Sequence, residues 1–128
     1  MLIVGLVLAG MAALLHVYIF YLESVAWTRR PGRAVFGLTA EQAESTRELA
    51  FNQGFYNVFL AIITLLGIVL VGFDRLLIGA TLVLAGIGSM LAAALVLFCS
   101  NRGRGRAALV QGSMPLLSIV ALVMGLIS

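Results

Sequence analysis

The sequence predicts an all-α integral membrane protein, a bundle of four transmembrane helices in a single domain over residues 1–128. Hydrophobic residues make up 62% of the chain and charged residues 10%, whereas soluble domains usually carry about 25% charge. Four uncharged stretches of 22, 25, 26 and 22 residues remain: Met1–Leu22, Leu49–Phe73, Leu76–Asn101 and Ala107–Ser128. Because about 20 apolar residues cross a bilayer, the pattern excludes a soluble enzyme, a nucleic-acid-binding protein and a disordered chain.

The first helix is expected from about Leu2 to Ala26. It lacks the positively charged start and the small-residue cleavage site of a signal peptide, so we interpret it as a retained span. Pro31 and Gly32 in the following connection are a breaker pair. Thr39 and Gln42 have the spacing of a capping box, which predicts a second helix from about Ala40 to Val71. Such a helix is roughly 48 Å long, so its first turns should protrude into water.

A tight turn is expected at residues 72–74, where glycine precedes phenylalanine and aspartate. The third helix then runs from about Arg75 to Phe98, and its small residues recur at Gly79, Gly86 and Ala93. Such a stripe permits close helix packing, within the bundle or against a second copy in a homo-oligomer. A connection rich in glycine and arginine leads to the fourth helix, from about Arg106 to the C-terminus.

Orientation follows from the arginines. Seven of the eight lie in or beside the first and third connections, on one side of the membrane, and only Arg75 lies on the other. The positive-inside rule predicts that the arginine-rich side faces the cytoplasm. Both termini are then outside.

Polar residues within a span are costly, so each needs a reason. In the first helix, steps of four and three place Gly5, Ala9, Ala12, His16, Phe20, Glu23 and Trp27 on one face. His16 is expected near mid-membrane and Glu23 near the cytoplasmic boundary, roughly 10 Å apart along the axis. Either can be a ligand-binding group or a structural one, Glu23 as an interfacial carboxylate and His16 bonded to a neighbouring helix.

The second helix carries the densest polar cluster: Asn52, Gln53, Tyr56 and Asn57. These side chains spread over an arc of about 140°. Interhelical hydrogen bonding would need only one amide, so the cluster favours a lined cavity. In the fourth helix, Pro115 leaves the carbonyl of Gln111 without its helical donor, which adds a polar spot at the same depth.

These depths predict a polar pocket in the cytoplasmic half of the bundle that binds, and in one version transforms, a small polar or amphipathic molecule. The expected ligand-binding residues are His16, Glu23, Asn52, Gln53, Tyr56, Asn57 and Gln111. If chemistry occurs, His16 or Glu23 is the acid–base candidate and Tyr56 an oxyanion donor. No cofactor or metal is expected, because one histidine with one carboxylate falls short of a metal site. The expected partners are membrane lipid and an unidentified small molecule.

Two alternatives stay open: a small proton-coupled transporter or efflux protein, and a structural subunit without a ligand. A transporter must open to both sides, yet small residues line the outer half, which favours a pocket open on one side.

The order of motifs resembles the bacterial four-span family catalogued as domain of unknown function 1304. The resemblance rests on the run from His16 to Glu23, Trp27, the run 35–38, the run Asn52–Asn57 and the run Gln111–Pro115. It covers nearly the whole chain and implies a four-span fold in which these positions form a set. It implies no activity, because the family is named for lacking one.

Overall fold

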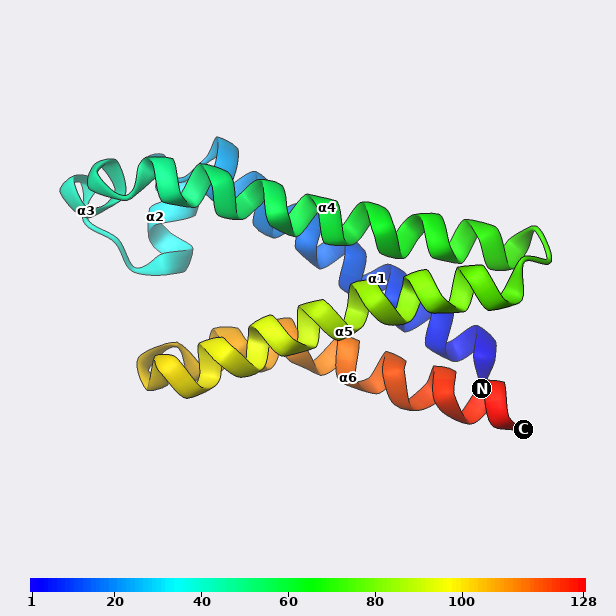
Figure 1. Ribbon diagram of the computed structural model, residues 1–128. Helices are drawn as coiled ribbons and strands as arrows, with labels where there is room; N and C mark the ends of the chain where they lie inside the picture. The colour runs from blue at the N-terminus through cyan, green and yellow to red at the C-terminus, as the bar shows by residue number, and fades with distance from the viewer.

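The computed structural model describes residues 1–128, apart from the side chain of Arg102. Its four long helices are each apolar and long enough to cross a membrane, and each runs antiparallel to the next along the chain (Figure 1). They are α1 (Leu2–Phe20), which continues into the π-helical segment η1 (Tyr21–Val25), α4 (Arg47–Gly72), α5 (Leu76–Ser100) and α6 (Gly105–Ile127). Shorter elements fill the connections: α2 (Arg30–Phe36), α3 (Ala40–Ser45) and the 3-10 turn η2 (Arg102–Arg104). The predicted four-helix fold is confirmed.

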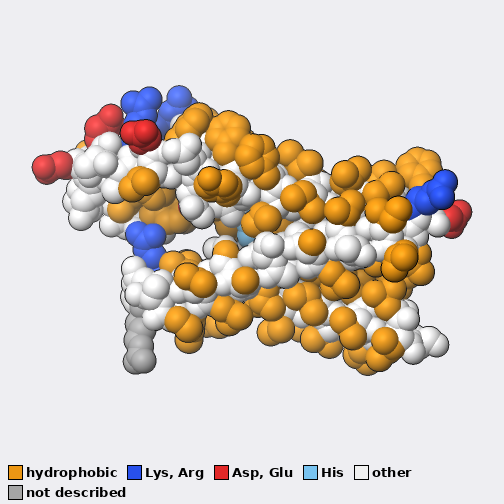
Figure 2. Space-filling model, viewed as in Figure 1, with side chains coloured by type: hydrophobic (Ala, Val, Ile, Leu, Met, Phe, Trp, Pro, Cys, Tyr) orange, Lys and Arg blue, Asp and Glu red, His pale blue; other side chains and the backbone are white. Residues whose placement is uncertain are grey.

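The four long helices form a closed ring of neighbours, in which α1 packs on α4 and α6, and α5 packs on the same two helices. Both chain termini lie at one end of the bundle, beside the α4–α5 turn (Figure 1). We call this the terminal end. The opposite end holds α2, α3 and η2 with most of the arginines, and we call it the arginine-rich end. In Figure 2, charged side chains gather at the two ends and hydrophobic ones cover the body between them.

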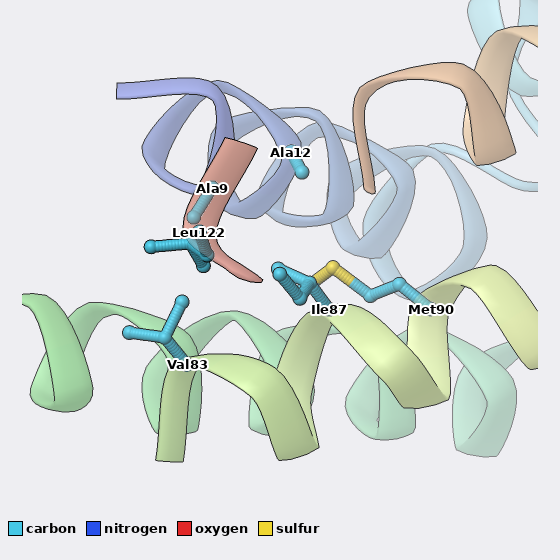
Figure 3. Packing of buried hydrophobic residues seen from close by; sticks show 6 residues of the cluster. All are labelled: Ala9, Ala12, Val83, Ile87, Met90 and Leu122. Atoms are coloured by element: carbon cyan, nitrogen blue, oxygen red, sulfur yellow. The ribbon is translucent and has the colours of Figure 1, made fainter. Parts of the chain in front are cut away.

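The terminal half is packed through small residues, as the sequence predicts. A methyl group on Gly79 of α5 would lie 2.6 Å from the carbonyl oxygen of Gly67 in α4, so the two backbones are in direct contact. Gly5 of α1 meets Leu122 of α6 equally closely. Between these contacts, six buried side chains from α1, α5 and α6 point toward one another (Figure 3): Ala9, Ala12, Val83, Ile87, Met90 and Leu122.

The predicted stripe on α5 is divided between two surroundings. Gly79 and Gly86 are buried against α4, where Gly86 contacts Thr64. Ala93 is exposed. The small residues therefore serve packing within the bundle as far as Gly86, and a role for Ala93 in a homo-oligomer stays a prediction.

The second helix is not continuous from Ala40 to Val71, so that prediction was wrong. The capping box is present, because Thr39 and Gln42 bond each other's backbone at 3.1 and 3.0 Å. The helix breaks at Thr46, whose hydroxyl donates to the carbonyl oxygen of Gln42 at 2.7 Å and accepts from the Trp27 indole at 3.1 Å. Such side-chain bonding offers the backbone an alternative to the helical ladder. α3 and α4 are the two resulting pieces.

The first connection also differs from the prediction. Pro31 and Gly32 do not break a helix but stand inside the short helix α2, with Pro31 in its first turn, where its missing N–H costs nothing. The helix ends at Gly37, whose φ of 65° is left-handed and suits glycine. The first span also departs from a plain α-helix to Ala26, because its last turn is η1, in which the Ala26 amide donates to the Tyr21 carbonyl at 2.9 Å.

Candidate functional site

Two of the predicted site residues meet across the α1–α4 contact. The Asn57 amide nitrogen donates to a carboxylate oxygen of Glu23 at 2.8 Å. Asn57 is 7% exposed and Glu23 is half-buried, so this is a polar bond inside the bundle and close to the arginine-rich end. It links η1 with the middle of the polar cluster of α4.

A glycine allows this approach. Gly54 lies one helical turn before Asn57, and a methyl group there would lie 3.0 Å from the backbone nitrogen of Ser24 and 3.1 Å from Cβ of Glu23. The Ser24 hydroxyl in turn donates to the Phe51 carbonyl at 2.8 Å. Without a side chain at position 54, η1 can lie directly on α4, and the Glu23 carboxylate reaches Asn57.

The π-helical turn belongs to the same arrangement. A π-helix bonds residues five apart, so η1 holds one residue more than an α-helical turn would, and such turns are frequent at functional sites. Within η1, Glu23 and the neighbouring Ser24 both contact α4. In a regular α-helix, adjacent side chains point about 100° apart. The wider turn lets both face one helix.

The hydrogen-bond donors of this pair are fully used. Asn57 has two amide hydrogens, and its nitrogen bonds both the Glu23 carboxylate and the Gln53 carbonyl, the latter at 3.1 Å. Both partners can only accept, which fixes the amide orientation. Oδ1 of Asn57 and Oε1 of Glu23 have no bond to a described residue, and neither is among the buried atoms without a partner. Both acceptors therefore retain accessible surface.

His16 lies deeper in α1 and is fully buried. Its Nδ1 is 2.9 Å from the carbonyl oxygen of Ala12, one turn earlier. Since a carbonyl can only accept, Nδ1 donates, and in the neutral ring Nε2 then carries the lone pair. Nε2 is buried without a partner among the described residues. It is a third unused acceptor.

At the arginine-rich end the bundle is notched. Figure 2 shows the half containing α4 separated there from the half containing α5. Arg104, in the connection between α5 and α6, lies with its guanidinium carbon 6.0 Å from the centroid of the Phe36 ring in α2. Its positive charge also acts on the Glu23 carboxylate. The third connection thus reaches the first near Glu23.

The other predicted residues are not brought to this centre. Tyr56 is 65% exposed, and Asn52 and Gln53 are exposed on α4. The Asn52 amide donates to the Glu48 carbonyl of its own helix at 3.2 Å. At 26 residues and about 39 Å, α4 is longer than a roughly 30 Å hydrocarbon core. A role for Asn52, Gln53 and Tyr56 in ligand binding stays a prediction.

Gln111 in α6 is half-exposed, and Pro115, four residues later, is buried. Two surface hollows lie elsewhere. One of about 290 Å³ is an apolar groove between α5 and α6 that includes Leu91 and Leu116. The other, of about 420 Å³, is lined by Glu44, Ser45, Arg47, Glu48 and Phe51. Neither includes Glu23, Asn57 or His16.

Sequence reasoning missed the residues that position the pair. Gly54 stands inside the polar cluster, and a glycine in mid-helix is a signal of close backbone approach that could have been used. Ser24 and Arg104 gave no such signal, because their roles depend on η1 and on how the two connections fold. Among the described residues, no three of histidine, cysteine, aspartate and glutamate are grouped to hold a metal ion.

Fold and site together define the class: a four-span helical membrane protein with a partly buried polar centre toward one end of the bundle. The chain belongs to the family described as "Protein of unknown function (DUF1304)", whose model matches residues 10–123. That match covers every motif on which the resemblance rests. Neither a search of curated proteins nor a search of solved structures found a match.

Proposed function

We propose that this membrane protein binds a small polar or amphipathic molecule at the arginine-rich end, with Glu23, Asn57 and His16 as the centre of the site. The observation that carries the proposal is the set of acceptor atoms without partners among the described residues: one on each of these three side chains. The acceptors of Glu23 and Asn57 are accessible to a ligand, whereas Nε2 of His16 is buried. Buried polar groups in proteins are nearly always paired, so the unpaired Nε2 calls for an explanation. A bound molecule that donates to these atoms supplies one.

Packing alone accounts poorly for the centre. A structural role would be complete with the Asn57–Glu23 bond, and an apolar pair of the same size would serve that contact as well. An ionisable side chain within a span is a functional-site hypothesis by default. The structural-subunit alternative leaves His16 unexplained, because its Nε2 is buried and meets no described partner.

Binding from one side is favoured over transport. At the terminal end, Gly125 of α6 would meet the backbone of Leu2 with any added side chain, and Gly79 would meet Gly67. The Ser118 hydroxyl donates across the α1–α6 contact to the Gly5 carbonyl at 2.7 Å. A transporter would have to separate these backbone contacts in each cycle. The proposed site therefore opens toward the arginine-rich end, which the arginine count assigns to the cytoplasm.

The test replaces both members of the pair. The double variant Glu23→Leu with Asn57→Leu removes the polar bond but keeps the volume, and such replacements are often neutral or stabilising. We expect it to insert and fold with unchanged or higher thermal stability in detergent. It should lose the stabilisation that a total lipid extract or a polar metabolite extract of the source cells gives the parent protein.

The matched control makes the same two substitutions on the exposed side of α4, Glu48→Leu with Asn52→Leu. If the centre alone binds the molecule, the control keeps the stabilisation. If the control loses it as well, Asn52 belongs to the site as the sequence predicts. Full stabilisation of the Glu23–Asn57 double variant would return the pair to a structural role.

A further inference from the structure

We propose that the group recognised at this site is a cationic hydrogen-bond donor, the primary ammonium group of an aliphatic amine. This inference rests on the proposed function and adds the chemical class of the ligand. It comes from counting what the side chains of Glu23, Asn57 and His16 leave unused: on these three, acceptors remain and donors do not.

The count is unusual for a polar site. Both amide hydrogens of Asn57 are committed, one to Glu23 and one to the Gln53 carbonyl. The single N–H of a neutral His16 ring is committed to the Ala12 carbonyl. What is left is one carboxylate oxygen, one amide oxygen and one imidazole lone pair. A ligand that could only accept hydrogen bonds would find no partner on these three side chains.

Charge and geometry narrow the choice of donor. The free oxygens of Glu23 and Asn57 belong to side chains that are themselves joined by a bond of 2.8 Å, so both acceptors are part of one polar pair. A hydroxyl has one hydrogen and no charge to offer the carboxylate. An ammonium group has three hydrogens and a positive charge, and bonds to charged groups are about twice as strong as neutral ones.

The surroundings favour an aliphatic body. On the two helices that carry the pair, the Phe20 and Phe55 rings meet edge to face at 5.1 Å between centroids. Leu22, next to Glu23, is buried. An alkyl chain attached to the ammonium group has no polar group that such apolar side chains would leave unpaired.

Arg104 is the cation with which such a ligand competes. Its charge acts on the Glu23 carboxylate, yet its guanidinium carbon lies over the Phe36 ring, and it makes no ion pair with Glu23. The opposite class of ligand also has a candidate group, because Arg33 Nε in α2 is a buried donor without a described partner. An anionic probe therefore belongs in the test.

The experiment measures binding of three probes of equal chain length to the full protein in nanodiscs of zwitterionic lipid: hexylammonium, hexanol and hexanoate. We expect hexylammonium to bind most tightly and hexanoate not to bind. Glu23→Gln keeps the shape, removes the charge and should weaken hexylammonium binding about tenfold or more. Glu48→Gln, the same change at an exposed position of α4, should leave binding unchanged. Arg104→Gln should strengthen it by removing the competing cation.

The outcomes separate the two proposals. Binding of hexanoate that Arg104→Gln weakens would overturn the amine assignment and leave the site in place. Equal effects of Glu23→Gln and Glu48→Gln on hexylammonium would show partition into lipid and would also overturn it. If the double variant Glu23→Leu with Asn57→Leu keeps the stabilisation that the extracts give, the proposed function is wrong, and the amine assignment is wrong with it.

Discussion

The two halves of this bundle use their polar and small residues in opposite ways. In the terminal half, glycines bring helix backbones into contact, and the Ser118 hydroxyl donates across two helices to the Gly5 carbonyl. In the arginine-rich half, the helices are interrupted, and Nε2 of His16 and one acceptor each on Glu23 and Asn57 have no partner among the described residues. The comparison teaches that one half of a small membrane bundle can supply the rigidity while the other carries polar groups that packing does not require.

The comparison depends first on which half faces the cytoplasm. We expect a phosphatase reporter that is active only outside the cytoplasm to be fully active when fused after Ser128, because seven of eight arginines lie at the opposite end. A reporter active only in the cytoplasm should be silent at the same position. The reverse result would place the polar centre on the outer side and remove the cytoplasmic route to it.

The rigidity of the terminal half can be broken at one glycine. Gly79→Ala should lower stability by about 1–3 kcal/mol or more, because its methyl group would meet the backbone of α4, which cannot rotate away. Gly88→Ala is the control on the same helix, since nothing lies within 4 Å of a methyl group there. Thermal unfolding in detergent should separate the two variants, and equal melting temperatures would contradict the close contact.

The polar pair can be weighed with a double-mutant cycle. Asn57→Leu alone should destabilise by about 1–3 kcal/mol, because it leaves the half-buried Glu23 carboxylate without its donor. Adding Glu23→Leu should recover most of this loss. Chemical unfolding of the parent, both single variants and the double variant measures the coupling. Additive effects would mean that the two side chains are solvated independently.

The hydrogen bond of the terminal half should matter less. Ser118→Ala removes the bond to the Gly5 carbonyl, and interhelical hydrogen bonds in membranes average about 0.6 kcal/mol. We expect a melting temperature slightly below the parent's and unchanged ligand stabilisation. A larger loss of stability than in Asn57→Leu would reverse the ranking of the two halves.

The uncharged stretches predict the four spans to within a few residues, because a membrane requires uncharged length of a helix, although the second helix was expected to begin too early, at Ala40. Gly5, Ala9 and Ala12 were likewise predictable as a packing face. The site was predictable only in part. Helical periodicity puts Asn52, Gln53, Tyr56 and Asn57 on one broad arc, but a helix surface has no inside until its neighbours are known. Gly54 determines which side of α4 faces inward. The turn η1 packs on α4 at Gly54, where no side chain stands in the way, so Asn57 faces inward and Tyr56 outward.

The break at Thr46 and the turn η1 were beyond sequence reasoning for a different reason. Both depend on a partner far away in the chain: the Trp27 indole bonds Thr46, and η1 rests against Gly54. Neither contact can be predicted from the local helix propensity of the sequence. Periodicity assumes 3.6 residues per turn throughout, so it cannot register a turn that holds one residue more.

The extra residue in η1 makes the exact length of the first span important for how that span contacts α4. Deleting any one residue between Tyr21 and Val25 would allow an ordinary α-helical turn, and the composition would still be that of a good membrane span. The rest of the span would stay nearly in register, because the π-helical turn fits its extra residue into roughly the rotation of an ordinary turn. What would be lost is the arrangement in which Glu23 and Ser24 both contact α4. Among related chains, an insertion or deletion within η1 would therefore change which side chains contact α4, even where the residues of α4 are identical.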